Sequence, residues 1–330
     1  MVETIYTEPV SKLLTYGDCL EIDEQVEDPE RDRLFQALEK GGADSLSRDW
    51  LSEFNPLPKV ERWPKYVEEL GLTQAHVPEL IRMATDDELN RLPDDDLAVW
   101  APVHAWRCLG QLKAEEAITP LIRYYFGRRQ SDWAMEELPW VLSLIGESAI
   151  APLSKYLSAR KNKVRGRVSA LEGLDIIGRR NPNLKGKCLE VLVAQLSEYQ
   201  RNSEEMNGFL ASSVINLGGV QHAELIEAVY QSGRIDETIC GTWPSVQVDL
   251  GLAKEEVFDP EELKLPKSEW ADSAERESDK PTAYDLGVHK KGQRDEPYDE
   301  LSVVYGKGKL KFGKRKAKGQ TRQKKKGFSR

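Results

Sequence analysis

Apolar residues recur along much of this chain at the three- and four-residue spacing of helices, and the apolar segments come in pairs. The first segment of each pair ends in a glycine, and a second apolar run begins a few residues later. This spacing is typical of helices rather than strands. The closing glycines are Gly71, Gly110, Gly146, Gly178 and Gly218. Their intervals of 39, 36, 32 and 40 residues predict about five helical pairs of similar size.

Two of the second segments are nearly identical. Residues 117–121 read Ala-Ile-Thr-Pro-Leu, and residues 149–153 read Ala-Ile-Ala-Pro-Leu. Proline is tolerated in the first turn of a helix, so Pro120 and Pro152 predict where two second helices begin. We expect the glycines to close the first helices in a left-handed cap, which glycine adopts without a Cβ penalty. Because one pair cannot bury its apolar face alone, the pairs must stack, and the sequence predicts an all-α solenoid.

The period, the closing glycine and the Ala-hydrophobic-x-Pro-Leu opening resemble HEAT-like repeat proteins of the armadillo-type superhelix class. More narrowly, residues 77–86 and 104–112 look like a group of largely uncharacterised bacterial HEAT-repeat proteins. The resemblance covers roughly residues 60–252, plus a short stretch at 13–17. Members of that group often carry a cysteine-rich, zinc-binding SEC-C motif, which is absent here, so the resemblance supplies no metal site or cofactor. It implies an alpha-alpha superhelix whose second helices line the concave surface.

The distribution of charged residues, together with the repeats, divides the chain into four segments. We expect a capping arm or insertion at 1–58, the HEAT-like repeats at 59–252, an acidic and largely disordered linker at 253–306, and a disordered basic tail at 307–330. The sequence holds 47 Lys and Arg against 56 Asp and Glu, and its net charge is −9. Twelve of the basic residues and none of the acidic ones lie in the tail, so the first 306 residues carry −21 and the tail +12. The body should repel nucleic acid, while the tail attracts it.

The tail has too few apolar residues to form a packed unit. Its positive charge can contact the phosphates of RNA or DNA, an acidic protein, or the acidic body of the same chain, and the sequence leaves these alternatives open. The basic residues of the tail are Lys307, Lys309, Lys311, Lys314, Arg315, Lys316, Lys318, Arg322, Lys324, Lys325, Lys326 and Arg330.

A second candidate binding surface comes from the repeats. Measured from the repeated proline, Arg123 and Tyr124 occupy the same offsets as Lys155 and Tyr156. Stacked repeats would set two cation–aromatic pairs side by side in the solenoid groove, where they could grip a protein segment. The alternative is that the two tyrosines pack between helices.

His104, Trp106 and Trp133 form a possible aromatic and polar patch. For the histidine we expect a helix-surface or interhelix hydrogen-bonding role rather than a base, and for the tryptophans core packing or a protein-binding anchor. Residues 94–96 are three aspartates, which predict the N-terminal cap of the next helix. The carboxylates at 136–137 are expected on a solvated face.

The sequence contains no nucleotide-binding or nucleophile motif, no histidine pair at metal-ligand spacing, and no apolar run of the ~20 residues that cross a membrane. Its four cysteines are far apart and its N-terminus lacks a secretory pattern, which favours the cytoplasm. We therefore expect a non-catalytic scaffold or adaptor that binds a protein partner in its groove. The alternative is an enzyme-accessory role, because some HEAT-like repeat proteins act as phycobilin lyases on bilin chromophores. That role needs a pocket of aromatic and acidic residues.

Overall fold

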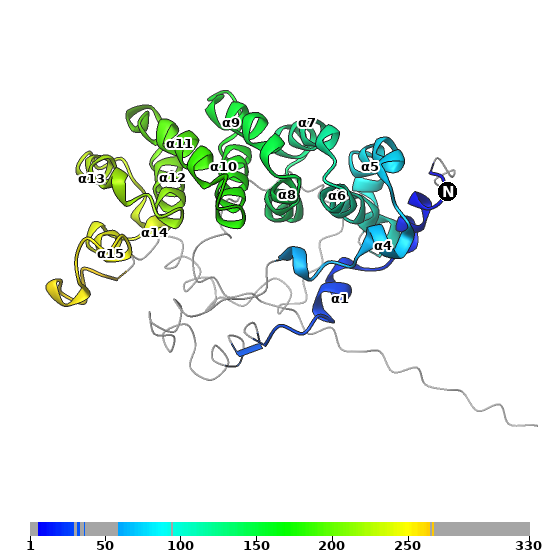
Figure 1. Cartoon of the computed structure of the whole chain (residues 1–330), viewed down its shortest axis with the longest axis horizontal. Coiled ribbons are helices and arrows are strands. Elements are labelled where there is room, and N and C mark those ends of the chain that lie inside the picture. The colour runs from blue at the N-terminus through cyan, green and yellow to red at the C-terminus, as the bar shows by residue number, and fades with distance from the viewer. Residues whose placement is uncertain are drawn as a thin grey trace, which may run out of the picture.

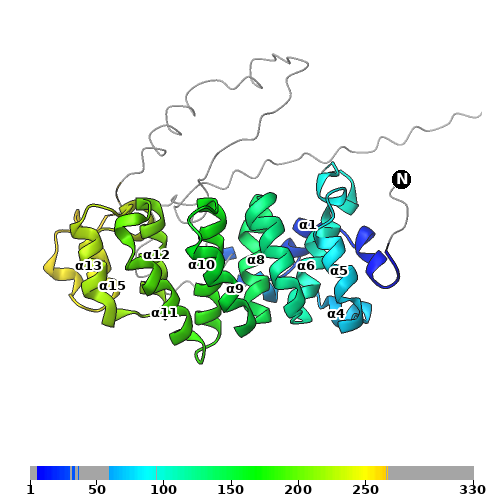
Figure 2. The same cartoon turned by 90° about the horizontal axis from the view of Figure 1, so that it is seen from above.

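The computed structural model describes residues 6–29, 32–33, 36, 59–93, 95–264 and 266. All regular secondary structure in these ranges is helical, so the expected all-α class is confirmed. The helices follow one another in chain order along a curved row (Figures 1 and 2). One apolar core runs through the row from Tyr6 to Val246. The basic tail and most of the acidic linker lie outside the described residues.

The first helices of the five pairs form the inner row, on the concave side of the curve (Figure 1). Neighbours in this row pack directly on each other, α6 on α8, α8 on α10 and α10 on α12. The helices of the inner row are α4 (Tyr66–Leu70), α6 (Ala101–Gln111), α8 (Asp132–Ile145), α10 (Val164–Arg180) and α12 (Glu204–Asn216).

The second helices form the outer row, so the expectation that they line the concave side is wrong (Figure 1). The physical reason is spacing: neighbouring first helices are in extensive contact, whereas neighbouring second helices touch less, and the row bends toward its tighter side. The helices of the outer row are α5 (Val77–Ala84), α7 (Ile118–Leu121) with its π-helical continuation η8 (Ile122–Arg128), α9 (Ile150–Ser158), α11 (Lys185–Leu196) and α13 (Ala223–Gln231).

Shorter elements complete the row. At the N-terminal end, η1 (Val10–Thr15) packs on α6 and brings part of the expected capping arm into the core. The other short α-helices are α1 (Cys19–Glu24), α14 (Glu237–Cys240) and α15 (Trp243–Asp249). The remaining 3-10 turns are η3 (Lys59–Glu61), η4 (Gln74–His76), η5 (Leu89–Arg91), η6 (Leu97–Trp100), η7 (Glu115–Ala117), η9 (Glu147–Ala149), η10 (Tyr199–Arg201), η11 (Val220–His222) and η12 (Glu255–Val257).

The two nearly identical segments adopt the same local structure. In each, a 3-10 turn leads into a second helix, η7 into α7 and η9 into α9, and Pro120 and Pro152 both lie in the first turn of that helix. The cap expected at residues 94–96 is found at Asp96, whose side chain accepts a hydrogen bond from the backbone N–H of Ala98 at 3.0 Å, whereas Asp94 lies outside the described residues. Local sequence signals therefore predict these helix starts correctly.

The glycines serve two purposes rather than one. Gly71 closes α4 with a φ of 65°, the expected left-handed cap. Gly110 and Gly178 instead lie inside α6 and α10 and let helices approach closely. A Cβ on Gly110 would lie only 3.4 Å from the Cα of Val141 in α8. The left-handed position after α6 is taken by Lys113, with a φ of 52°.

Replacing Gly166 with alanine is expected to destabilise the chain by about 1–3 kcal/mol, the usual cost of overpacking. The new Cβ would overlap the backbone carbonyl oxygen of Phe126 in η8, which cannot rotate away. Urea unfolding measures the effect. Gly186→Ala in α11 is the matched control, because its Cβ would meet nothing within 4 Å. Equal stability of the two variants would contradict the close packing of α10 on η8.

Candidate functional site

The two cation–aromatic pairs expected in the groove separate into exposed cations and packed tyrosines. Arg123 and Lys155 are exposed on the outer row. The hydroxyl of Tyr124 donates to the carboxylate of Asp87 at 2.7 Å, and burial together with this bond raises the pKa of Tyr124 to about 12. The hydroxyl of Tyr156 donates to a backbone carbonyl oxygen of η8, also at 2.7 Å. Interhelix packing, the alternative for the tyrosines, is therefore confirmed.

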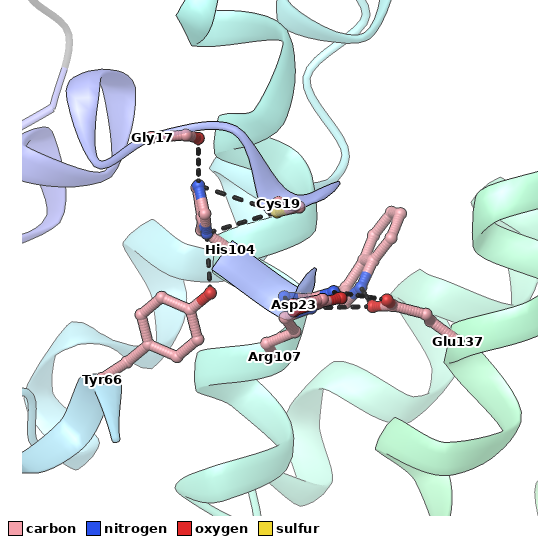
Figure 3. A network of polar contacts seen from close by, with 8 residues as sticks. Gly17, Cys19, Asp23, Tyr66, His104, Arg107 and Glu137 are labelled. Carbon is pink, nitrogen blue, oxygen red and sulfur yellow. Dashed lines mark hydrogen bonds and ion pairs between the residues drawn. The ribbon is translucent and has the colours of Figure 1, made fainter. Parts of the chain in front are cut away.

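His104 is fully buried in α6, where it ties three chain segments together (Figure 3). Its Nε2 lies 2.9 Å from the carbonyl oxygen of Gly17, and its Nδ1 lies 2.7 Å from the hydroxyl of Tyr66. A carbonyl oxygen only accepts, so Nε2 carries the proton and Nδ1 accepts from the tyrosine. Burial lowers the pKa of His104 to about 4, which keeps the ring neutral at pH 7. The expected interhelix hydrogen-bonding role is confirmed.

The thiol of Cys19 also lies beside this ring. Its Sγ lies 3.6 Å from Nδ1 and 3.7 Å from Nε2 of His104. Burial raises the pKa of the Cys19 thiol well above its ordinary value, and both ring nitrogens already have partners. A reactive cysteine needs a lowered pKa and an accessible sulfur, so this pair has a structural role.

Arg107 lies one helical turn after the histidine and contacts two carboxylates (Figure 3). Its guanidinium is fully buried and donates to both oxygens of Asp23, from Nη1 at 3.0 Å and from Nη2 at 2.7 Å. It also donates to Glu137, from Nε at 2.9 Å and from Nη2 at 2.5 Å. The ring of Trp63 lies under the guanidinium, with its centroid 5.1 Å away. This network fastens the N-terminal arm to α6 and α8.

Glu137 contradicts the expectation of a solvated face, because only 3% of it is exposed. A helix that packs on two neighbours buries more than one stripe, and Glu137 faces α6 while Glu136 stays exposed. The same carboxylate accepts a hydrogen bond from the indole nitrogen of Trp106 at 3.0 Å. Trp106 is 2% exposed and packs edge-on against Tyr125, so its expected core role is confirmed.

Trp133 differs from Trp106 because it lies at the surface of the inner row. Its ring is half-buried and packs edge-on against Trp100, with centroids 5.2 Å apart. Its buried Nε1 finds no hydrogen-bond acceptor among the described residues. Beside it opens a small pocket of about 70 Å³, which we call the Trp133 pocket. The pocket is lined by Asp23, Arg62, Trp133, Glu136 and Glu137.

Several residues of this site were not singled out by the sequence pattern, Arg107 and Asp23 among them. An arginine at an otherwise apolar helix position is a signal of a buried ion pair, and Arg107 is the one charged residue in α6. Asp23 carries no comparable signal, because its partner is 84 residues away.

Neither a metal site nor a membrane-spanning helix is found in the described ranges. No group of three or more His, Cys, Asp or Glu side chains there is placed to hold a metal ion. None of the helices in the same ranges is long and apolar enough to span a membrane.

Comparison with models of known protein families, with curated proteins and with solved structures gives no match for this chain. Function is therefore inferred from the fold and from the geometry of the described residues.

Proposed function

We propose that this chain is a HEAT-like repeat scaffold that binds a protein partner without catalysis, and that its basic tail adds electrostatic contact with nucleic acid or an acidic partner. The paired helices stacked in chain order support the HEAT-like assignment. The nearest approach to a catalytic pair, Cys19 with His104, is buried and structural. Binding therefore has more support than chemistry.

The observation that carries the proposal is an open groove of about 410 Å³ between α9 and α11 on the outer row. Apolar side chains combined with a polar rim are typical of protein-binding surfaces. The exposed Lys155 lies on the same helix but is not among the residues that line the groove. The groove is lined by Ser154, Leu157, Ser158, Glu190, Val191, Ala194, Gln195 and Glu198.

Blocking this groove with a larger side chain is expected to abolish binding of the protein partner. In Ala194→Arg, a long charged side chain replaces an exposed methyl group in the groove, and at least tenfold less partner should be captured from native cell extract. Ala151→Arg is the matched control, since Ala151 is also exposed on α9 but does not line the groove. Quantitative mass spectrometry of the captured proteins measures the difference. Equal capture by both variants would contradict this location.

Removing residues 307–330 is expected to abolish retention on RNA or DNA at low salt, because the remaining body carries −21. For the full chain, the logarithm of the binding constant should fall linearly with the logarithm of salt concentration, with a slope set by the number of phosphates contacted. Filter binding across a salt series measures both. Retention of the truncated chain equal to that of the full chain would contradict a nucleic-acid role for the tail.

The phycobilin lyase-like alternative has less support. Pockets for ligands of that size usually measure about 300–1,000 Å³, whereas the Trp133 pocket, which has the aromatic and acidic character required, measures about 70 Å³. Incubation with bilin distinguishes the two functions, because a change in its absorbance spectrum would favour the lyase-like role.

A further inference from the structure

We propose that the groove between α9 and α11 takes an acidic segment of the protein partner, whose carboxylates lie at the end formed by Leu157, Ser158 and Glu198. These are the last lining residues of the two helices in chain order. The inference rests on the proposed function and deepens it, because it assigns a charge to the segment that the groove binds.

The segment that contains α9 and the start of α10 is basic, although the body of the chain is acidic. Residues 148–171 hold six basic side chains and no acidic one, whereas the first 306 residues carry −21. A positive region on a negative protein attracts acidic partners and orients them. The six side chains are Lys155, Arg160, Lys161, Lys163, Arg165 and Arg167.

Two features bring this positive charge to one end of the groove. Ser158 lines the groove, and the connection from α9 to α10 begins directly after it. Within that connection, Arg160 contacts the carboxylate of Glu198, also a lining residue, at 2.9 Å. Arg201 contacts the same carboxylate at 3.1 Å. The one carboxylate at this end of the groove is therefore already paired with two guanidinium groups.

Lys161 and Lys163 lie in the same connection and are both exposed. Neither forms an ion pair within the described part of the chain. Exposed lysines are common on solvated surfaces, so they do not define a site by themselves. They do supply two cations at the rim that a partner can reach.

Arg167 adds a buried cation behind these lysines. It is 5% exposed, and its Nε donates to the carbonyl oxygen of Leu157, a lining residue, at 2.7 Å. Its Nη2 is buried and has no acceptor among the described residues. The buried Arg107 contacts two carboxylates, whereas Arg167 contacts none in the same ranges. Burial, followed by the charge of Arg160, lowers the pKa of Arg167, as expected of a guanidinium without a carboxylate partner.

The end of α9 accounts for only part of this positive charge. The last carbonyl groups of a helix carry partial negative charge and attract cations. Here the carbonyl oxygens of Tyr156 and Leu157 accept from Asn162 at 2.9 Å and from Arg167 at 2.7 Å. One nitrogen of the buried guanidinium is left over. Because salt screens buried charges less than exposed ones, Arg167 should attract an anion to this end of the groove.

The groove favours an acidic peptide over nucleic acid. Its lining includes the apolar side chains of Leu157, Val191 and Ala194, and the exposed carboxylate of Glu190 lies nearer the other end. Nucleic acid carries phosphates along its whole length and would meet Glu190 as well. A peptide can place carboxylates beside the basic end and apolar side chains along the rest.

Photo-cross-linking of the full chain with two synthetic peptides tests the inference. Both peptides have the same order of leucine, serine and a benzophenone cross-linker, and they differ only in carrying glutamate or lysine. Cross-links to residues 154–158 and 190–198 should be about tenfold more frequent with the glutamate peptide, because the basic end repels the lysine peptide. Tandem mass spectrometry maps the cross-links, so contacts with the basic tail are counted separately.

Reversing the charge of the rim should reverse the preference. Lys161→Glu with Lys163→Glu should cross-link the lysine peptide better than the glutamate peptide. The matched control is Lys185→Glu with Lys254→Glu, which makes the same charge change at exposed lysines outside the groove lining. This control should keep the wild-type preference. The same reversal in both double variants would overturn the inference, since net charge alone would explain it.

Two substitutions at Arg167 test the buried cation. Arg167→Met should lower cross-linking of the glutamate peptide about threefold, whereas Arg167→Lys, which keeps the charge, should preserve most of it. Circular dichroism checks that both chains are folded. Unchanged cross-linking in Arg167→Met, or equal losses in the two variants, would overturn a role for this charge.

The wild-type chain can also contradict the acidic segment directly. Equal cross-linking of the two peptides to the groove, or none by the glutamate peptide, would overturn it. A benzophenone-labelled single-stranded DNA that cross-links to the groove more than the glutamate peptide would overturn it in favour of nucleic acid. The capture experiment with Ala194→Arg decides the proposed function separately, because it compares partner loss without reference to the charge of the partner.

Discussion

Replacing Arg107 with methionine is expected to lower the free energy of unfolding by about 3–5 kcal/mol, the usual cost of removing one partner from a buried ion pair. The wild-type guanidinium is fully buried and bonds Asp23 and Glu137 at 2.5 to 3.0 Å. Methionine fills a similar volume but leaves two carboxylates facing each other across an apolar side chain. Urea unfolding followed by circular dichroism measures the loss.

A double variant separates the charge effect from the packing effect. Arg107→Met with Glu137→Met also removes the more buried of the two carboxylates that Arg107 contacts, so it should be more stable than Arg107→Met alone. Arg160→Met is the matched control, because Arg160 is 45% exposed in its pair with Glu198 and should contribute less than about 1 kcal/mol. A loss below 1 kcal/mol in Arg107→Met would show that the network does not hold the arm on the repeats.

Acidification is expected to destabilise the chain through His104. Its pKa is about 4 in the folded protein, against an ordinary value of 6.5, so the unfolded chain binds the extra proton first as the pH falls. The contribution of His104 is fully present above about pH 6.5 and is lost as the pH falls toward 4, with a maximum loss of about 3 kcal/mol. Free energies of unfolding measured between pH 4 and pH 7 give this slope.

The comparison chain for this experiment is His104→Gln, which keeps a polar side chain but cannot titrate in that range. Its free energy of unfolding should be lower at pH 7, yet it should change less between pH 6.5 and pH 4 than that of the wild type. Parallel pH profiles for the two chains would contradict a buried, neutral histidine and would place the titration elsewhere.

Helix starts were predictable because their signals are local. The Ala-Ile-x-Pro-Leu segments and the cap at Asp96 act within one turn, so residues a few positions apart are enough to recognise them. Glycine was harder to interpret, because the same residue type serves a turn at Gly71 and close helix packing at Gly110. Only the neighbouring helix distinguishes those two roles.

The candidate site was only partly predictable. His104, Trp106 and Trp133 were singled out together, and the structure places the first two on α6 and the third on α8. Their different surroundings could not be foreseen, since Trp106 lies in the core and Trp133 borders a pocket. Glu137 was misassigned because exposure on a helix depends on how many neighbours the helix has.

Spacing along the chain was sufficient to predict the helical class, and composition was sufficient to predict the division of charge between body and tail, since these depend on residue order and residue type. Tertiary packing alone decided which row faces inward, which carboxylate is buried and which residues form the Trp133 pocket. The bond between Asp23 and Arg107 joins residues 84 positions apart. Such a contact forms only after the helices have stacked and brought distant segments to one face. No local sequence pattern therefore predicts it.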